Sequence, residues 1–463
     1  MARLIVIGGG PSGLATALFS ARRGHSVLVL ERDGDLPPDD ADECFESWQR
    51  RGVGQIRQAH QTLALGNLVL TQEAPDVFAK LSEEAPLVPM INPPLPGVPM
   101  FLGVRRTTFE SGLRKAVEAE PGVEIMTGAI VNGLVADTGG AVPHVSGVRI
   151  KDGRVFEADL VIDATGRATQ IQKWLGPIGA RPCPEDHQRV GFTYLTRWYR
   201  LHEGAAMPQQ TIPPGMQASY GYFLAVLGDR RTFCLVMILS NDDPHRQALS
   251  TPEVFDRVAS EIPLHAPWLA VGTGITKPQA FANVHNCNRT LVDQDGPIVT
   301  GLLLVGDSAS HTNPTLGRGL SLALAHAQEA ARSADRVAAD PVAHAAAFAK
   351  WTDDNIGCWY ETQAAVDVAA AARMQAIFAG TSVPQAAYAA RVFEALAACA
   401  ATDESFVEVF QSVAGVLTPI KEVLKQPGVL ERIEPFLDNQ GHAFPPCSLT
   451  RERFEQLATL EAG

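Results

Sequence analysis

The sequence predicts an α/β protein with three parts: a doubly wound parallel-sheet domain, an antiparallel β-sheet inserted into it, and a helical region at the C-terminal end. Three observations support this prediction. A short apolar run at residues 4–7 leads directly into a glycine-rich turn and a helical pattern, as a strand buried on both faces does. Residues 186–276 change to long strands of alternating polarity. After residue 345 the chain is rich in alanine and helical in pattern.

The first element is a glycine motif between two apolar strands. Residues 8–13 have the sequence Gly-Gly-Gly-Pro-Ser-Gly, which is G-x-G-x-x-G, and they open a helix expected over residues 14–23 and ended by Gly24. The second strand, residues 26–30, is followed by Glu31. A Rossmann-like fold places the acid that holds a ribose hydroxyl at a similar distance from its glycines. The combination predicts a Rossmann-like dinucleotide-binding domain.

The pyrophosphate of a dinucleotide explains these residue types. Gly8 permits the tight turn, Gly10 leaves the backbone open to the phosphates, and Gly13 lets the helix approach the strand. The helix N-terminus offers free N–H groups to the anion, and Glu31 repels a 2′-phosphate, so the adenosine is expected to belong to FAD or NAD and not to NADP. The alternative is a glycine-rich turn without a ligand. The candidate cofactor-binding residues of this motif are Gly8, Gly10, Pro11, Ser12, Gly13, Glu31 and Arg32.

The composition predicts a cytoplasmic enzyme of more than one domain. The 463 residues include 38 basic and 51 acidic side chains, a net charge of −13, with no basic cluster. Nucleic acids and anionic membranes are therefore not expected as partners. The seven cysteines are scattered without C-x-x-C spacing, which favours reduced thiols. No apolar run reaches the roughly 18 residues of a membrane span, so none is expected.

The segment after the glycine motif mixes loops, helices and short strands. Residues 33–46 are polar and are expected to form a loop. A cationic stretch at residues 48–55, which contains Arg50, either returns to a cofactor phosphate or lies in a solvated loop. Helices are expected over residues 61–81 and from residue 105. Short strands that predict a three-stranded antiparallel appendage lie at residues 123–126, 128–136, 145–151 and 154–156.

The inserted sheet is expected to cover the face on which a cofactor presents its reactive group. Its strands are predicted at residues 190–201, 220–227 and 232–239, with the last two paired across a turn, and a helix is predicted at residues 252–261. The aromatic residues Trp198, Tyr220 and Tyr222 are candidate substrate contacts. Aromatic strand residues also pack in cores, which is the alternative for all three.

Two later apolar strands return the chain to the first domain. The strand at residues 160–163 ends in Asp163, and the strand at residues 302–305 ends in Gly306 and Asp307. Carboxyl ends of parallel strands form the ligand-binding edge, where the Asp307 carboxylate can accept ribityl hydroxyls or merely cap a helix. In the loop that follows, Pro314, Gly317 and Gly319 precede a helix expected from residue 320. The helix N-terminus there can stabilise the negative charge of a reduced flavin.

The expected organisation has four segments. Residues 1–185 and 277–345 form the nucleotide-binding domain, and residues 186–276 form the inserted substrate domain. Residues 346–463 form the helical region, which we expect either to pack over the substrate region or to make an oligomer contact.

Three motifs together resemble a known family. They are the glycine motif with Glu31, Asp-Ala-Thr-Gly-Arg at residues 163–167, and Gly-Asp followed by Pro-Thr-Leu-Gly-Arg-Gly at residues 314–319. In this order and spacing they resemble the FAD-dependent monooxygenases with the aromatic-hydroxylase fold, over roughly residues 1–345. The stretch at residues 48–55 with His60, and the Asn-Pro-Thr-Leu-Gly-Arg-Gly sequence, resemble the branch that contains olefin epoxidases of natural-product pathways.

The resemblance implies roles for individual residues. Arg50 and Arg106 would contact the phosphates or ribityl chain of FAD, and Asp307 the ribityl chain. The isoalloxazine ring would be bordered by Pro314, Gly317 and Gly319.

Two departures from the family pattern bear on the electron donor and on catalysis. The commoner hydroxylases have Asp-Gly where this chain has Asp163 and Ala164, a pair linked to use of the nicotinamide donor. The donor is therefore expected to be NADH or NADPH, or an external reduced flavin supplied by a flavin reductase. The family histidine after Gly-Asp-Ala-Ala is replaced by Ser310, with His311 one residue later. His311 is the one catalytic candidate, and a generic loop histidine is the alternative.

The resemblance implies an oxygenation reaction. Reduced FAD would add O2 to give a C4a-hydroperoxide, which passes one oxygen to an apolar, polyketide- or terpenoid-like intermediate of secondary metabolism, such as antibiotic biosynthesis, by epoxidation or hydroxylation. No base stands out in residues 186–276, which favours an olefin or an enolate-like substrate.

Two other functions stay open at this stage. One is a redox-neutral cyclase of a polyketide-like chain, for example a decalin-forming cycloaddition, with FAD in a structural role. The other is a flavin-linked reductase or dehydrogenase. A binding module without chemistry is disfavoured because two motifs surround the reactive ring and not only the adenosine.

Overall fold

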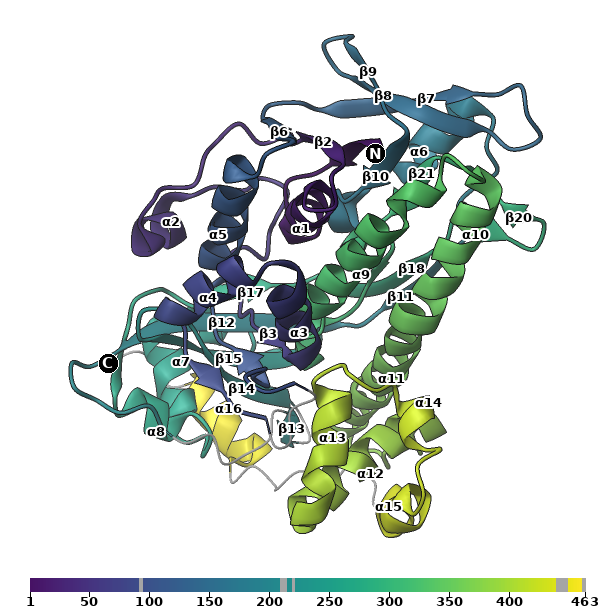
Figure 1. Ribbon diagram of the computed structural model, residues 1–463. Helices are drawn as coiled ribbons and strands as arrows, with labels where there is room; N and C mark the ends of the chain where they lie inside the picture. Colours follow the sequence, from purple (N-terminus) through teal and green to yellow (C-terminus); the bar gives the residue numbers. More distant parts are fainter. Residues whose placement is uncertain (91–94, 209–214, 219–220, 439–448, 460–463) are drawn as a thin grey trace.

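The structure is a computed structural model that describes residues 1–90, 95–208, 215–218, 221–438 and 449–459 (Figure 1). Figure 1 shows a parallel sheet with its helices in the upper half, an antiparallel sheet below it, and a group of C-terminal helices beside that sheet. This arrangement confirms the predicted fold class.

A five-stranded parallel sheet forms the centre of the first part, in the order β21-β10-β1-β2-β6. Its strands are almost wholly buried in the middle of the sheet, as continuous apolar runs require. The bounds are Arg3–Ile7 for β1, Ser26–Leu30 for β2, Val123–Met126 for β6, Leu160–Asp163 for β10 and Leu302–Leu304 for β21. The sequence places three of these carboxyl ends beside polar residues, so the ligand-binding edge is built from segments far apart in the chain.

Of the four short strands predicted after residue 122, the first joins the parallel sheet and the other three form the appendage. β6 pairs with β2 in parallel. The three-stranded antiparallel appendage consists of β7 (Val131–Asp137), β8 (His144–Ile150) and β9 (Val155–Glu157). The predicted appendage is thus confirmed.

Three helices pack together on one face of the parallel sheet. They are α1 (Pro11–Ala21), α5 (Arg106–Ala119) and α9 (Gly319–Ser333), and Figure 1 shows α1 between the other two. Every residue of α1 is buried. The helix begins at Pro11, three residues before the predicted start, because proline is accepted in the first turn, where its missing N–H would have no partner.

The single helix predicted over residues 61–81 is wrong. The chain forms a short strand, β3 (Thr62–Leu63), and then two helices, α3 (Ala64–Glu73) and α4 (Pro75–Glu84). Pro75 forces the break, because its ring disfavours a helical conformation at Ala74, whose φ and ψ are −147° and 60°. β3 pairs with β5 (Phe101–Leu102), which also pairs with β4 (Leu87–Val88).

The loop predicted over residues 33–46 contains a helix. This helix, α2 (Ala41–Ser47), begins after Asp40, whose side chain accepts hydrogen bonds from the N–H groups of Asp42 and Glu43. The acidic residues that made the segment polar thus act as a helix cap and first turn.

The inserted part is a six-stranded antiparallel sheet. Its order is β13-β14-β15-β12-β16, with β17 also paired to β12, so the sheet continues past residue 276. The bounds are Phe192–Leu201 for β12, Gly215–Ala218 for β13, Gly221–Leu227 for β14, Thr232–Ser240 for β15, Gly272–Gly274 for β16 and Gln279–Phe281 for β17. β14 and β15 pair across the predicted turn.

The two faces of this sheet have different neighbours. On β15, Leu235 and Met237 pack with helix α7 (Pro252–Ala259), whereas Val236 points to the opposite face and lines a cavity. Alternation along the strand therefore leaves one face as the wall of a site. A smaller sheet of β11 (Glu185–Arg189), β18 (His285–Arg289) and β22 (Ser310–His311) connects this part to the parallel-sheet domain.

The C-terminal region is helical, as predicted. Its helices are α10 (Pro341–Thr352), α11 (Cys358–Ala379), α12 (Tyr388–Thr402), α13 (Val407–Ala414), α14 (Ile420–Val423), α15 (Val429–Leu437) and α16 (Arg451–Thr459). Helices α11, α12 and α13 border the same cavity as β15, and α16 packs against α7. None of the described helices is both long and apolar enough to cross a bilayer.

A substitution at Gly13 tests how closely α1 lies on the sheet. A Cβ there would stand 1.9 Å from the backbone oxygen of Gly8, whereas a Cβ at Gly10 meets no described atom within 4 Å. Gly13→Ala should lower the free energy of unfolding of the FAD-free protein by more than about 2 kcal/mol, because backbone must move. Gly10→Ala should change it by less than about 0.5 kcal/mol. Urea unfolding of both variants measures this, and equal losses would contradict it.

Candidate active site

One cavity of about 890 Å³ brings the sequence motifs together. Its first region is formed by the glycine motif at the start of α1 and by Glu31. Its second region is formed by residues 306–319, which we call the β21–α9 loop. Strands β12, β14 and β15 and helices α11, α12 and α13 line much of the rest.

The glycine motif is shaped for close approach of a ligand to backbone. Gly8 has φ +104°, and a Cβ there would stand 2.6 Å from the carbonyl oxygen of Ala164. Around Gly10 a Cβ would meet open space on the cavity side. Among described residues no side chain caps the N-terminus of α1, nor that of α9, and both helices start in the wall of the cavity. Two free helix N-termini in one cavity fit a ligand with two electron-rich groups, as in the pyrophosphate and pyrimidine edge of FAD.

Glu31 is held in place by backbone and by an arginine. Its Oε2 accepts a hydrogen bond from the Gly9 N–H at 2.6 Å, and its Oε1 accepts one from the Asp33 N–H at 2.8 Å. The side chain lines the cavity although it is 4% exposed. Each carboxylate oxygen can accept a second hydrogen bond, so Oε1 keeps room for a ribose hydroxyl.

Arg50 lies under this acid and is surrounded by carboxylates. Its guanidinium pairs with Glu31 and Asp33, each at 3.0 Å, and with Glu110. Burial disfavours its charge, but Glu110, Glu31 and Asp33 together raise the pKa of Arg50. The structure therefore assigns Arg50 a role in orienting Glu31, and its contact with a phosphate stays a prediction.

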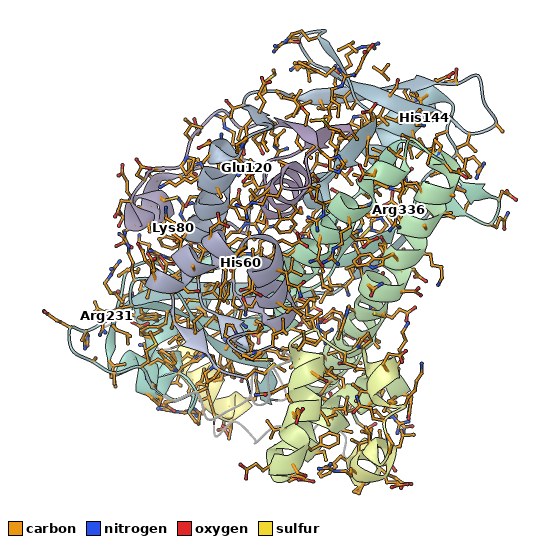
Figure 2. All side chains as sticks on the ribbon, in the orientation of Figure 1. His60, Lys80, Glu120, His144, Arg231 and Arg336 are labelled. Carbon is orange, nitrogen blue, oxygen red and sulfur yellow. The ribbon has the colours of Figure 1, made fainter. Side chains whose placement is uncertain are left out.

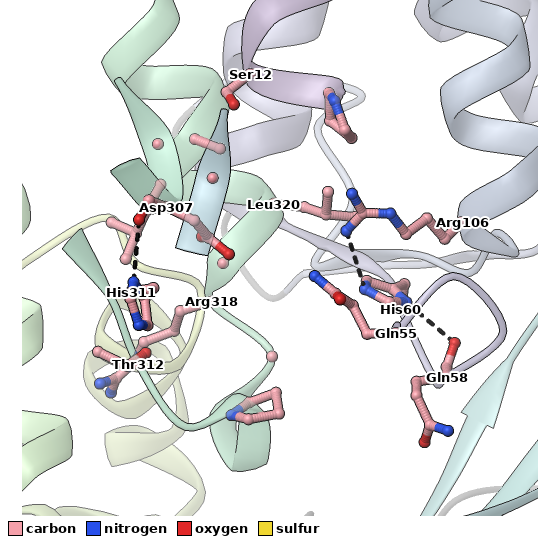
Figure 3. Close-up of a pocket in the computed structure, with 18 of the residues that line it drawn as sticks. Ser12, Gln55, Gln58, His60, Arg106, Asp307, His311, Thr312, Arg318 and Leu320 are labelled. Carbon is pink, nitrogen blue, oxygen red and sulfur yellow. Dashed lines mark hydrogen bonds between the residues drawn. The ribbon is translucent and has the colours of Figure 1, made fainter. Parts of the chain in front are cut away.

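Arg106 belongs to a second chain of contacts across the cavity (Figure 3). Its Nη1 donates to His60 Nε2 at 3.5 Å, and His60 Nδ1 donates to the Gln58 carbonyl at 3.0 Å. Burial, and then the charge of Arg106, lower the pKa of His60 to about 3. His60 is therefore neutral at physiological pH with a fixed tautomer. Gln58 accepts a hydrogen bond from Thr196 of β12, which joins this chain to the antiparallel sheet.

Asp307 lies after β21 in the wall of the cavity, as the sequence predicts for a strand end. Its Oδ2 accepts a hydrogen bond from Arg167 Nε at 3.2 Å. Burial opposes its ionisation, but Arg167, His311 and Arg106 outweigh this and lower the pKa of Asp307. An ionised acceptor at this position suits a ribityl hydroxyl, and that contact stays a prediction.

Asp163 and His326 hold the backbone at the carboxyl ends of β10 and β21, next to Asp307. Asp163 Oδ1 accepts hydrogen bonds from the Thr165 N–H at 2.9 Å and from Ser308 Oγ at 3.2 Å, which ties the second motif to the third. His326 Nδ1 accepts the Gly306 N–H at 3.2 Å, and burial lowers the pKa of His326 to about 3. The neutral histidine is required there, because a protonated ring cannot accept the hydrogen bond.

His311, the predicted catalytic candidate, lines the cavity and is 2% exposed. Its Nδ1 donates to the Asp307 carbonyl at 3.0 Å, and its Nε2 has no hydrogen-bond partner among the described residues. Burial lowers the pKa of His311 to about 4, against the opposing effect of Asp307. A neutral ring with a free Nε2 can accept a hydrogen bond from a ligand but does not supply a proton.

The β21–α9 loop continues along the cavity. Pro314, Gly317 and Gly319 all line it, and Gly317 has φ +65°, a left-handed turn that favours glycine. A buried polar cluster holds the loop from behind: the Asp367 carboxylate accepts hydrogen bonds from Asn313 at 2.7 Å, and also from Asn286 and Gln363. Burial raises the pKa of Asp367 to about 6 despite these donors.

Two of the three predicted aromatic substrate contacts, Trp198 and Tyr222, do not face the cavity. Trp198 and Tyr222 are buried in the core of the sheet and do not line the described cavity. Trp198 packs edge-on against Phe45, and its indole N–H donates to the Arg57 carbonyl at 2.7 Å, so the side chain is satisfied within the protein. Tyr220 lies outside the described residues.

Other residues, which sequence reasoning did not single out, line the cavity instead. Tyr194 and Thr196 do so from β12, with the Tyr194 hydroxyl donating to Asn313. Tyr194, Thr196 and Trp198 point to the same face of β12, because side chains alternate along a strand. A polar threonine between two aromatic residues was the signal that this face lines a site and is not wholly core. Arg167 and Arg318 were present in the quoted motifs, but only the tertiary structure shows that their side chains face the cavity.

The fold and the cavity define a protein with a doubly wound domain suited to a dinucleotide cofactor. Residues 1–334 match the family model described as FAD binding domain, and the chain belongs to that family. FAD is accordingly its cofactor, and the predicted kinship with FAD-dependent monooxygenases of the aromatic-hydroxylase fold is confirmed.

Individual relatives are distant but cover most of the chain. The chain is 27% identical to 6-methylpretetramide 4-monooxygenase of Streptomyces rimosus over 350 residues, 73% of this chain and 74% of that protein. The structure of PqsL, a probable FAD-dependent monooxygenase from Pseudomonas aeruginosa, matches with a TM-score of 0.59 at 16% identity, over 82% of this chain and 99% of that one. The Diels-Alderase PyrE3 of pyrroindomycin biosynthesis matches with a TM-score of 0.56 at 18% identity, over 90% and 80%.

Replacing Glu31 tests its place in the cofactor site. Glu31→Gln turns an amide NH2 toward donors that now point at a carboxylate, so the FAD dissociation constant should rise by about tenfold or more. Fluorescence of released FAD measures the constant. Glu120→Gln, which removes a carboxylate paired with Arg22 on the surface, serves as the control. Equal FAD affinity of the wild-type protein and Glu31→Gln would contradict the assignment.

His326 predicts a loss of stability in acid. The lowered pKa of His326 keeps it neutral in the folded protein, so the unfolded chain binds more protons below its ordinary pKa. The wild-type protein should lose about 1 kcal/mol relative to His326→Gln between about pH 7.5 and about pH 5.5. Urea unfolding at both pH values gives this difference. His202→Gln, at an exposed histidine, should show no such change relative to wild type, and a pH-independent difference for His326→Gln would overturn the interpretation.

Proposed function

We propose that the protein is a monooxygenase that epoxidises or hydroxylates an apolar, polyketide- or terpenoid-like intermediate of a natural-product pathway. The observation that carries this proposal is the cavity itself, which joins a cradle for FAD to a largely apolar wall of sheet and helices. A relative whose name is 6-methylpretetramide 4-monooxygenase supports the reaction class and the substrate class.

The residues that would hold FAD divide by the part of the cofactor they face. The start of α1 and Glu31 suit the pyrophosphate and the adenosine ribose, and Asp307 with the start of α9 suits the ribityl chain and the ring. When bound and reduced, FAD would activate O2, from which one oxygen atom is transferred to the substrate. One oxygen atom enters the substrate and the other leaves as water, so a donor must supply two electrons.

The chain's own contribution is to orient the substrate and exclude water. Apolar residues of β14 and β15 and of the C-terminal helices enclose the cavity, which protects a reactive oxygen species from water. His60 and His311 are neutral and cannot donate a proton as imidazolium ions at physiological pH. A substrate whose reaction needs no protein acid, such as an olefin or an enolate, suits this lining.

The source of the electrons and the setting of the enzyme are part of the proposal. NADH, NADPH or a separate flavin reductase would reduce the FAD. We propose that the reaction takes place in the cytoplasm and belongs to secondary metabolism. We also propose that the protein can form an oligomer.

A redox-neutral cyclase is the second candidate. The fold neighbour PyrE3 is described as a Diels-Alderase and covers most of this chain, which favours it. Ala164 in place of the glycine linked to nicotinamide use supports the same candidate. In that case FAD would shape the cavity without changing its oxidation state.

Oxygen consumption separates the two candidates. The purified holoprotein is reduced under anaerobic conditions with NADH, NADPH or a reduced-flavin system and is then mixed with 18O2 and apolar polyketide or terpenoid candidates. The monooxygenase should consume one O2 per product and give a product with one added 18O atom. A product of unchanged mass, formed while FAD stays oxidised, would overturn the proposal in favour of the cyclase.

A further inference from the structure

Arg318 is a buried charge for which the described protein offers no hydrogen bond. Its side chain is 3% exposed, and all three guanidinium nitrogens lack a hydrogen-bond partner among the described residues. The guanidinium lies over the ring of Trp359 at 4.9 Å and near the ring of Phe393 at 5.6 Å. Burial lowers the pKa of Arg318 to about 10, so the side chain stays charged at physiological pH.

The nearest carboxylate does not act as its hydrogen-bonded partner. Asp367 opposes the effect of burial on Arg318, but its oxygens are hydrogen-bonded to the side-chain amides of Asn286, Asn313 and Gln363. Burial of a charge without a hydrogen-bonded counter-ion is unfavourable. The contrast with Arg50, which pairs with three carboxylates in the same cavity wall, indicates that Arg318 is left for a ligand.

Arg318 borders a part of the cavity that we call the helical lobe, formed by α11, α12 and α13. Phe393, Ala397 and Ala401 of α12 line it at four-residue spacing, which places them on one face of the helix. Phe410 and Ala414 of α13 line it at the same spacing. The alanines leave space where larger residues would fill it, and Ala401 is exposed, so the lobe reaches the surface there.

Figure 3 shows where Arg318 lies relative to the predicted cofactor residues. The Arg318 side chain lies on the same side of the view as His311 and Thr312, and His60 and Arg106 lie on the other side. Figure 1 places α12 and α13 below α9, the helix that starts directly after Arg318. The lobe is therefore next to the β21–α9 loop and away from the adenosine end of the site.

We propose that the helical lobe binds the apolar chain of the substrate and that Arg318 pairs there with an anionic oxygen of that substrate, a carboxylate or an enolate. The proposal rests on the proposed function only in taking the ligand to be the substrate. An anionic oxygen could also come from the pyrimidine edge of reduced FAD, since α9 begins beside Arg318, and the experiment must separate the two sources.

Equilibrium binding to the oxidised holoprotein tests the substrate source. Calorimetry measures the dissociation constants of decanoate and of 1-decanol, which share an apolar chain and differ in charge. The wild-type protein should bind decanoate at least about tenfold more tightly than decanol, and Arg318→Met should lose this preference while keeping its affinity for decanol. Arg332→Met removes a half-exposed arginine from α9, the helix that follows Arg318, and should behave as wild type. Absence of a preference in wild type, or its retention in Arg318→Met, would overturn the proposal.

Two further measurements complete the test. If Arg318→Met does not fold, two other variants carry the test. Arg318→Lys should keep part of the preference for decanoate, and Ala397→Phe should weaken the binding of both ligands because it fills the lobe. Binding equal to wild type in both variants would contradict the proposal.

The flavin reduction potential tests the alternative that the anion is reduced FAD. A lower potential in Arg318→Met, together with an unaltered preference for decanoate, would assign the anion to reduced FAD and overturn the substrate pairing. Neither measurement needs O2, so the result is independent of the oxygenation experiment.

Discussion

The structure depends on the close contact between helix α1 and the turn that directly follows strand β1. Gly13 lies so near the backbone of Gly8 that a single methyl group would stand 1.9 Å from a carbonyl oxygen. This contact fixes the N-terminus of α1 at the carboxyl edge of the parallel sheet. The same edge receives Glu31, Asp163 and Asp307 from strands that lie far apart in the sequence. The site thus follows from parallel topology, because parallel strands bring all their carboxyl ends to one side.

The two buried arginines of the cavity differ in how their charges are neutralised. At the adenosine end, Arg50 is matched by three carboxylates, so that region is stable before any ligand arrives. Beside the helical lobe, Arg318 is charged and has no hydrogen-bonded partner among the described residues, although two aromatic rings and the charge of Asp367 favour its charged form. Carboxylates of the protein neutralise Arg50, whereas Arg318 needs a ligand to supply its hydrogen-bonded counter-ion. This difference is expected when a cofactor and a substrate share one cavity.

The enclosure of the cavity comes from elements that contribute nothing to cofactor recognition. Alternation along β12 and β15 leaves one face of the antiparallel sheet for the cavity and the other for α7. The C-terminal helices complete the wall, and the side chains of Figure 2 fill the space between these layers. A largely apolar cavity wall beside a redox cofactor suits oxygen transfer, because it limits the water that can consume the reactive species.

The sequence by itself determined the parallel-sheet domain, the antiparallel insertion and the FAD family. Local signals sufficed for these: a glycine motif that opens a helix, continuous apolar runs for parallel strands, alternating runs for the antiparallel sheet, and a helix end at Gly24. The sequence also placed Asp307, His311 and the loop glycines in one site, because they lie in one short loop at the carboxyl end of a parallel strand. The helix break at Pro75 and the helix after Asp40 also have local signals in the sequence, a proline and an N-cap aspartate. The prediction missed them because the surrounding residues have a helical pattern in one case and a polar composition in the other.

Only the tertiary structure decided which polar side chains face one another. Arg50 meets Glu31 and Asp33 from one segment and Glu110 from another, and Trp198 lies in the core while Tyr194 lines the cavity. Arg318 looks like any loop arginine in the sequence, and its burial between two aromatic rings depends on helices more than 35 residues further along the chain. The physical reason is that charge pairing and burial depend on distances in space, and sequence periodicity sets only which face of its own element a residue occupies.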